Sequence, residues 1–136
     1  MEYGLQDRVA LITGSSHGIG KAIALALARE GADIIISGRT LDALVSVRTE
    51  LESFGRSVHS CYIDARDGQS VRFLFNNVVA KIGRLDILVN NVGGAETFGD
   101  FFTLTDADWK DAYDLNVMSM VYFSRAAIPW LRKSDS

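Results

Sequence analysis

The sequence predicts an α/β fold in which helices cover both faces of a parallel sheet. Three observations support this prediction. Short apolar runs rich in β-branched residues alternate with longer segments of helical periodicity. Glycines follow three of the helical segments, at Gly31, Gly55 and Gly83. A glycine-rich turn separates the first apolar run from the first helical segment. Such alternation builds βαβ units with right-handed crossovers, and therefore a doubly wound parallel sheet.

Four apolar runs are the expected strands, and they cover residues 9–13, 34–37, 58–63 and 85–90. Each contains valine or isoleucine and is shorter than a typical buried helix. A doubly wound sheet would place these strands in the order 3-2-1-4. The ligand crevice would then lie between the first and fourth strands, where the winding reverses.

Four helical segments connect or follow these strands. The first runs from about residue 18 to residue 30, and the second has apolar positions between 41 and 54. The third has its apolar residues at 71–79 and ends near Gly83. Thr105 and Asp108 have the spacing of a capping box at the start of the last helix, which continues through Ile128. Pro129 is expected to kink or end that helix.

The turn after the first strand is suited to a phosphate. Backbone N–H groups at a helix N-terminus attract a pyrophosphate, and glycines allow it to approach closely. Gly14 would permit the tight turn, Gly18 the approach of the phosphates, and Gly20 the packing of the helix against the strand. We therefore expect a dinucleotide to be bound by Thr13, Gly14, Ser16, His17, Gly18, Ile19 and Gly20.

The spacing T-G-x-x-x-G-x-G resembles that of the short-chain dehydrogenase/reductase family. Three later positions are similar to the family pattern: N-N-V-G at 90–93, with valine in place of alanine, Asp64-Ala65 after the third strand, and Asn116. The resemblance implies a Rossmann-like domain over residues 1–136, truncated after the fourth strand and its helix. It also implies that Asp64 accepts from the adenine amino group and that Asn116 is a catalytic residue that helps hold a water in the proton relay. Further cofactor contacts are implied for Ala65, Asn90, Val92 and Gly93.

Each of these residues also has a plainer interpretation. The glycines of the loop can serve as simple turn residues, and Asp64 can be a solvated loop acid or a cap. Asn90 can satisfy backbone groups at the end of its strand, and Asn116 can be an ordinary polar residue on a helix. A lone histidine such as His17 is more often a spacer than a catalyst.

The end of the second strand favours NADP over NAD. Relatives that prefer NAD carry an acidic residue there, which binds the ribose hydroxyls and repels a 2′-phosphate. This chain has Gly38 at that place, followed by Arg39. A guanidinium group matches a phosphate in charge and geometry. His17 replaces the arginine or lysine that many NADP-dependent relatives have in the glycine loop, which weakens the preference.

The residues that would transfer a proton in this family have no counterpart in the 136 residues. Carbonyl reduction by hydride leaves an alkoxide that needs a proton donor. The family uses a tyrosine with a lysine four residues later, and a serine upstream. No tyrosine of this chain is followed by lysine at that spacing. The chain therefore resembles the N-terminal half of an NAD(P)-dependent oxidoreductase and is expected to be inactive by itself. The alternative is a non-catalytic protein that binds a dinucleotide or a partner chain.

Composition limits the remaining possibilities. A net charge of -3 without a basic cluster argues against nucleic acid. A single cysteine, Cys61, excludes an intrachain disulfide, and no metal site is expected. No apolar run suggests a signal peptide or a membrane anchor, so a cytoplasmic protein is expected. The expected partners are a small-molecule substrate, if a C-terminal half completes the pocket, and further copies of the chain. Self-association is expected because the apolar strand at 85–90 would be an open sheet edge.

The segment 94–102 follows the fourth strand and contains three phenylalanines. In relatives this region forms part of the substrate pocket, so the aromatic side chains would favour an apolar substrate. The alternative is that they pack under a loop.

Overall fold

The computed structural model describes residues 2–135 and has one four-stranded parallel sheet. The strand order is β3-β2-β1-β4, as the sequence predicts. Leu11 of β1 is opposite Ile35 of β2 on one side and Leu88 of β4 on the other. The winding reverses between β1 and β4, so the crevice expected at this point opens at their carboxyl ends.

The elements follow one another in regular βαβ order. The strands are β1 (Val9–Ile12), β2 (Asp33–Gly38), β3 (Val58–Tyr62) and β4 (Ile87–Val89). The first helices are α1 (Gly18–Arg29) and α2 (Leu41–Glu52). The third helical segment consists of α3 (Gly68–Leu74), the π-helical η1 (Phe75–Val79) and α4 (Ala80–Ile82). The last consists of α5 (Asp106–Tyr113), the π-helical η2 (Asp114–Met118) and α6 (Ser119–Leu131).

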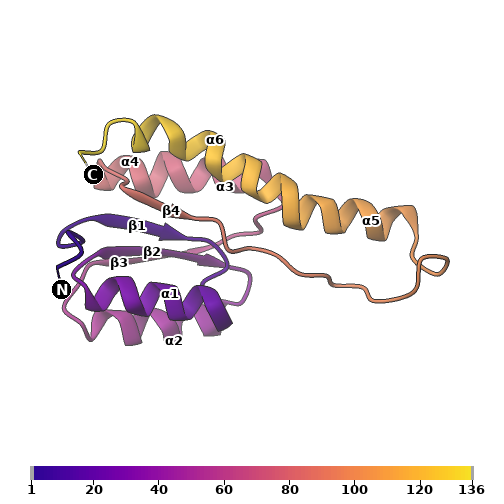
Figure 1. Ribbon diagram of the computed structural model, residues 1–136, viewed down its shortest axis with the longest axis horizontal. Helices are drawn as coiled ribbons and strands as arrows, with labels where there is room; N and C mark the ends of the chain where they lie inside the picture. Colours follow the sequence, from indigo (N-terminus) through magenta and orange to yellow (C-terminus); the bar gives the residue numbers. More distant parts are fainter. Residues whose placement is uncertain (1, 136) are drawn as a thin grey trace.

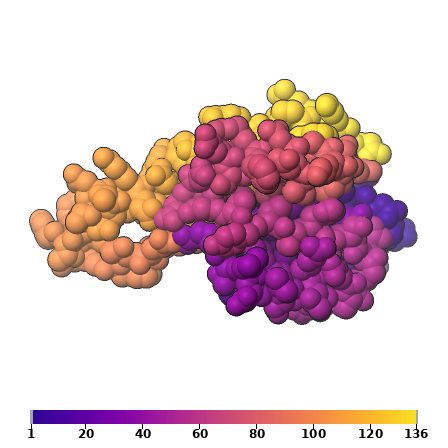
Figure 2. Space-filling model, turned by 180° about the vertical axis from the view of Figure 1, so that it is seen from behind, coloured from indigo at the N-terminus to yellow at the C-terminus, as the bar shows by residue number. Residues whose placement is uncertain are grey.

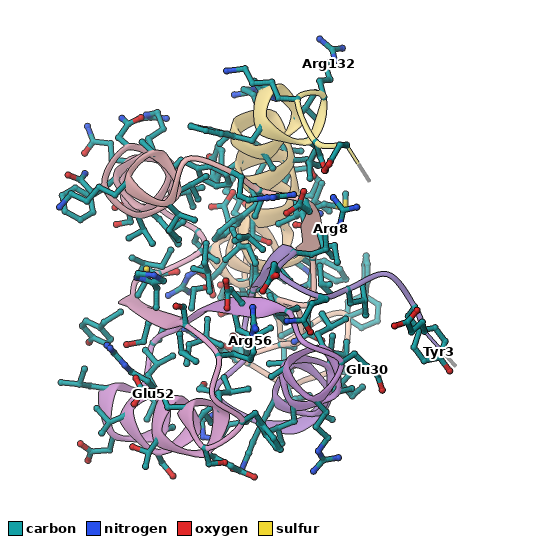
Figure 3. The ribbon with its side chains drawn as sticks, turned by 90° about the vertical axis from the view of Figure 1, so that its left-hand side faces the viewer. Tyr3, Arg8, Glu30, Glu52, Arg56 and Arg132 are labelled. Atoms are coloured by element: carbon teal, nitrogen blue, oxygen red, sulfur yellow. The ribbon has the colours of Figure 1, made fainter. Side chains whose placement is uncertain are left out.

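Two apolar cores lie on opposite faces of the sheet, because successive side chains of a strand point to opposite sides. Ala10 and Ile12 of β1 belong to the core covered by α1 and α2. Val9 and Leu11 belong to the core under α3 and α6, whose largest fully buried side chain is Phe123. Figure 1 shows these two helical layers on either side of the strands, and Figure 3 shows the same arrangement end-on.

Local chemistry explains where two of the helices begin or end. Gly83, with a φ of 84°, ends α4 in the left-handed conformation that glycine adopts most readily. Thr105 and Asp108 form the predicted capping box at the start of α5. Of the two expectations for Pro129, that it ends the last helix is wrong, because α6 continues to Leu131, and that it kinks the helix stays a prediction. Proline removes one backbone donor, and so close to the C-terminus the loss of one hydrogen bond is tolerated.

The segment between β4 and η2 extends away from the body formed by the sheet and its two helical layers. In Figure 1, α5 continues the direction of α6 beyond the end of the sheet, and Figure 2 shows the same region as a projecting lobe. All residues from Gly93 to Thr103 are exposed. In the part of the chain that the structure describes, every helix is too short or too polar to cross a membrane.

Candidate functional site

The glycine loop joins the end of β1 to the start of α1. Gly14 and Gly18 have φ values of 61° and 53°, which is the left-handed region where a side chain is strained. A Cβ atom on Gly18 would meet nothing within 4 Å, so open space lies in front of its backbone. His17 precedes the helix without capping it through its side chain. The first N–H groups of α1 therefore face an open position suited to an anion.

Gly20 is required by close packing rather than by its backbone conformation. A Cβ atom at this position would lie 2.5 Å from the carbonyl oxygen of Gly14 and 2.4 Å from Nδ2 of Asn91. The first turn of α1 thus contacts the loop directly, and it contacts Asn91 just after β4.

Hydrogen bonds attach the loop to the end of β4. The buried hydroxyl of Thr13 accepts from the backbone N–H groups of Asn91, at 2.9 Å, and Val92, at 3.2 Å. The Asn91 side chain donates to the Gly14 carbonyl at 3.0 Å. The two sides of the switch point are therefore held together by polar contacts within the chain.

A cavity of about 440 Å³ lies in the crevice between these segments. It is bounded by the glycine loop, the end of β2, the segment after β3 and the segment after β4. Nine of the predicted cofactor-binding residues line it: Gly14, Ser16, His17, Gly18, Ile19, Arg39, Ala65, Val92 and Gly93. Asn91 lines it too, although the sequence reasoning treated this residue only as part of a motif.

The other predicted site residues lie outside this lining. Thr13 and Gly20 act behind it, through the contacts described above. Asn90 is directed elsewhere, since its amide donates to the Ser124 hydroxyl of α6 at 3.1 Å. Asn90 and Asn91 thus serve different segments, as expected for consecutive residues in extended backbone.

Asn116 lies in the π-helical segment η2 and is bonded to the segment after β4. Its Oδ1 accepts from the Gly94 N–H at 2.9 Å, and its Nδ2 donates to the Gly94 carbonyl at 2.7 Å. The same Nδ2 donates to the Ala112 carbonyl at 2.8 Å. Both amide donors are therefore used within the chain. Isolated π-helical turns often occur at functional sites, and no periodicity in the sequence indicated this one.

Asp64 is engaged by Arg66, two residues later. The Arg66 guanidinium donates to both carboxylate oxygens, with Nη2 2.8 Å from Oδ2. These hydrogen bonds lower the pKa of Asp64 and outweigh the opposing effect of its burial. The carboxylate is therefore ionised, and it would need a free lone pair to accept from an adenine amino group.

Arg66 and Arg39 join a larger ionic cluster at the mouth of the cavity. Arg66 also pairs with Asp111 of α5 at 2.7 Å and with Glu96 at 3.2 Å. Glu96 forms a second ion pair with Arg39. Sequence reasoning missed Arg66, Glu96 and Asp111. The spacing of two residues between Asp64 and Arg66 could have indicated their ion pair from the sequence. Glu96 and Asp111 come from distant segments, so no local pattern indicates that they pair with Arg66.

A second cavity, of about 580 Å³, lies between β3 and α3. Its lining includes Cys61 and Phe73 but none of the predicted site residues. Burial raises the pKa of Cys61 to about 11, so the thiol stays protonated and unreactive near neutral pH. The chemistry expected from the sequence belongs to the smaller cavity.

The chain is similar to known proteins over almost its whole length. A family model described as short chain dehydrogenase matches residues 8–136. The 7α-hydroxysteroid dehydrogenase of Escherichia coli (strain K12) is 35% identical over 130 residues, which are 96% of this chain and 50% of that enzyme. An uncharacterised oxidoreductase of Bacillus subtilis (strain 168) is 37% identical over 137 residues, covering all of this chain and 51% of that protein.

Solved structures give the same result. L-Sorbose reductase from Gluconobacter frateurii, complexed with NADPH and L-sorbose, has a TM-score of 0.91 and 35% identity, covering 97% of this chain and 50% of that one. A 7α-hydroxysteroid dehydrogenase complexed with NADH and 7-oxo glycochenodeoxycholic acid has a TM-score of 0.87 and 36% identity, covering 95% of this chain and 50% of the other. The chain spans about half the length of these relatives. Its glycine loop and crevice correspond to their N-terminal, cofactor-binding half, and the chain belongs to the short-chain dehydrogenase/reductase family.

Proposed function

We propose that this chain is the NADP(H)-binding part of an oxidoreductase that transfers hydride between NADP(H) and a carbonyl or alcohol substrate. The observation that carries the proposal is the position of Arg39. It lines the same cavity as Gly14 and Gly18, at the end of β2 where the 2′-hydroxyl or 2′-phosphate of the adenosine is recognised.

The residues of the cavity fit a dinucleotide in three respects. Positive φ values at Gly14 and Gly18 leave backbone N–H groups uncovered at the start of α1, where a pyrophosphate is favoured. Gly38 has no acidic side chain that would repel a 2′-phosphate, and Arg39 follows it with a guanidinium group. When bound, the dinucleotide would supply the hydride in its reduced form or accept it in its oxidised form, and the residues of this chain would hold and orient its adenosine and pyrophosphate.

The relatives leave the choice of cofactor and of substrate open. L-Sorbose reductase was crystallised with NADPH and the 7α-hydroxysteroid dehydrogenase with NADH. One of these structures holds L-sorbose and the other 7-oxo glycochenodeoxycholic acid, so the two relatives differ in substrate as well as in cofactor. The preference for NADP rests on Arg39 and Gly38 alone.

Calorimetry with Arg39→Ala tests this preference. Charge-assisted hydrogen bonds to a phosphate contribute about 1.5–3 kcal/mol, so the variant should bind NADP about ten- to a hundredfold more weakly and NAD nearly unchanged. Arg48→Ala, on the exposed face of α2, is the matched control and should change neither affinity. An equal loss for both dinucleotides would contradict the proposed role of Arg39.

We further propose that the 136 residues bind the adenosine half of the cofactor and do not catalyse carbonyl reduction by themselves. Every residue assigned to adenosine and pyrophosphate is present, whereas no tyrosine has the lysine partner described above. 2′-Phospho-ADP-ribose should therefore bind about as tightly as NADP, and purified chain should show no NADPH-dependent carbonyl reduction. A large advantage for NADP, or turnover that disappears in Asn116→Ala, would contradict this.

The competing function is a non-catalytic protein that binds a dinucleotide or a partner chain. The exposed aromatic side chains after β4 favour a partner chain, since Phe98 and Phe102 are 86% and 94% exposed. They do not pack under a loop, which was one of the two expectations for this segment. A chain that binds neither NAD nor NADP by calorimetry would support partner binding and contradict the NADP(H) proposal.

A further inference from the structure

Glu96 links two arginines at the mouth of the cofactor cavity. One of its carboxylate oxygens pairs with Nη2 of Arg39, and the other lies 3.2 Å from Nη1 of Arg66. The three residues follow different strands: Arg39 comes after β2, Arg66 after β3 and Glu96 after β4. The Glu96 side chain therefore spans the carboxyl edge of the sheet beside the cavity, on the side that receives adenosine in the proposed function.

The two arginines differ in how much they depend on Glu96. Arg66 has two further carboxylate partners, Asp64 at 2.8 Å and Asp111 at 2.7 Å. Within residues 2–135, Glu96 is the one carboxylate at ion-pair distance from Arg39. The Arg39 and Glu96 side chains are 43% and 41% exposed, so water and solutes reach the pair. Losing Glu96 would leave Arg66 paired and Arg39 free.

We propose that Glu96 is a specificity-determining residue that lowers the affinity for NADP relative to NAD. The inference rests on the proposed function, because it requires Arg39 to receive the 2′-phosphate. A carboxylate and a phosphate use the same donors of a guanidinium group. The 2′-phosphate must therefore displace Glu96 from Arg39, and it is repelled by the carboxylate as it approaches. NAD has a hydroxyl at this position and leaves the ion pair in place.

The exposure of the ion pair limits its effect. Exposed pairs contribute little free energy because water competes for both charges. A phosphate with a charge near -2 therefore displaces the carboxylate, and NADP still binds. The free energy needed to break the ion pair lowers the affinity for NADP and leaves that for NAD unchanged. Displacement of Glu96 also removes the contact between the segment after β4 and Arg39, which follows β2.

Calorimetry of NADP and NAD binding to Glu96→Gln tests the inference. The variant keeps the size of the side chain and removes its charge. It should bind NADP about three- to fivefold more tightly and change its affinity for NAD less than about twofold. Glu52→Gln is the matched control, because Glu52 also pairs with an exposed arginine, Arg48, but lies on α2. Figure 3 labels Glu52 on the helical layer below the sheet. This control should change neither affinity.

A double variant and hydrogen exchange separate this role from a merely structural one. In an Arg39→Ala background, Glu96→Gln should tighten NADP less, because the competition for Arg39 is gone and only the charge repulsion remains. In the unsubstituted chain, 2′,5′-ADP should accelerate amide exchange in residues 94–98, and 5′-AMP should not.

The outcomes distinguish this inference from the proposed function. Binding of NADP that Glu96→Gln leaves unchanged would overturn the inference and leave the proposed function standing. An equal gain for NADP and NAD would also overturn it, because the carboxylate would then repel the shared pyrophosphate. If neither the chain nor Glu96→Gln binds either dinucleotide, both proposals are wrong. A selective gain for NADP that is smaller in the Arg39→Ala background would support both.

Discussion

Ion pairs gather at both ends of the parallel sheet, and the two groups differ in burial. At the amino end, the Asp86 side chain has no exposed surface and is contacted by Arg8 and Arg84. It also accepts from the Val9 N–H at 2.8 Å. At the carboxyl end, the carboxylates around Arg66 are those of Asp64, Glu96 and Asp111, and their side chains are 36%, 41% and 44% exposed.

The two clusters therefore serve different purposes although they use the same residue types. The Asp86 cluster connects the start of β1 to the start of β4 and to the C-terminal segment, where Ser134 donates to the Asp86 carboxylate. Figure 3 shows Arg8 at this end of the molecule, near the C-terminal segment. The Arg66 cluster adjoins the cavity through Glu96 and Arg39, of which Arg39 lines it. Partly exposed pairs can exchange with a charged ligand at little cost. Burial makes the first cluster structural, and exposure leaves the second available for binding.

The largest difference between the clusters should appear when one carboxylate is removed from each. Asp86→Ala should lower the free energy of unfolding by about 3 kcal/mol. It leaves the Val9 N–H without its buried acceptor, and among the described residues it leaves Arg8 and Arg84 with only the exposed Asp135 as a carboxylate partner. Asp111→Ala should lower it by less than about 1 kcal/mol. Urea unfolding measures both values, and similar losses would show that burial does not separate the clusters.

The second-largest effect is expected from acid, which should destabilise the protein by protonating Asp86. Burial raises the pKa of Asp86, but hydrogen bonds from Arg84, Ser134 and Val9 outweigh this effect and lower it to about 2. The ordinary value is 3.8, so the unfolded chain takes up this proton first as the pH falls. The stability contributed by Asp86 is complete above about pH 5 and is lost toward pH 2, and it amounts to about 2 kcal/mol.

Thermal unfolding between pH 6 and pH 2.5 checks this dependence. Asp86→Asn should remove about 2 kcal/mol of the loss caused by acid. Asp64→Asn should remove a smaller part of the acid-induced loss of stability, because that carboxyl group is partly exposed and solvent screens its interaction with Arg66. A larger effect of Asp64→Asn would reverse the comparison.

A smaller effect is expected where uncharged hydrogen bonds hold the carboxyl end together. Asn116→Ala removes two bonds to Gly94 and one to Ala112 and should cost about 1–2 kcal/mol. Asn77→Ala is a matched control, because Asn77 donates only to Phe73, four residues earlier, in the same way that Asn116 donates to Ala112. Chemical unfolding should show the larger loss for Asn116→Ala, and equal losses would mean that the Gly94 bonds contribute nothing.

The smallest effect concerns the exposed surfaces beyond the carboxyl end. In the described sheet, β4 pairs with β1 on one side, and Phe101 and Phe102 are 74% and 94% exposed. We predict that the chain self-associates at tens of micromolar (about the range in which exposed apolar surfaces associate). Sedimentation velocity should detect this, and a stable monomer would contradict it.

Paired substitutions identify the surface responsible for self-association. Replacing Phe101 and Phe102 together by serine should weaken association about fivefold if these side chains form the contact, since each exposed contact contributes roughly 1 kcal/mol or less. Phe73→Ser, at an exposed position of α3, is the control. If association is unchanged in the double variant, these two side chains do not form the contact, and the edge of β4 becomes the expected surface.

Local patterns were sufficient for the order of elements and for the glycine loop. The positive φ of Gly14 and the capping box at Thr105 depend on residues close in sequence, so their types and spacing predict them. The strand order followed from the alternation of strands and helices, because right-handed crossovers leave few arrangements. The prediction that Pro129 ends the last helix was wrong, because the effect of a proline depends on how many helical turns follow it.

The direction and partners of polar side chains were decided by the tertiary structure. The sequence by itself identified N-N-V-G as part of the site, but the packing of β4 between β1 and α6 decided that Asn91 reaches Gly14 and Asn90 reaches Ser124. Likewise, Arg39 was identified from its position after β2, whereas its pairing with Glu96 was not. A backbone conformation is set by its neighbours in sequence, while an ion pair across 57 residues forms only where strand order brings its two ends together.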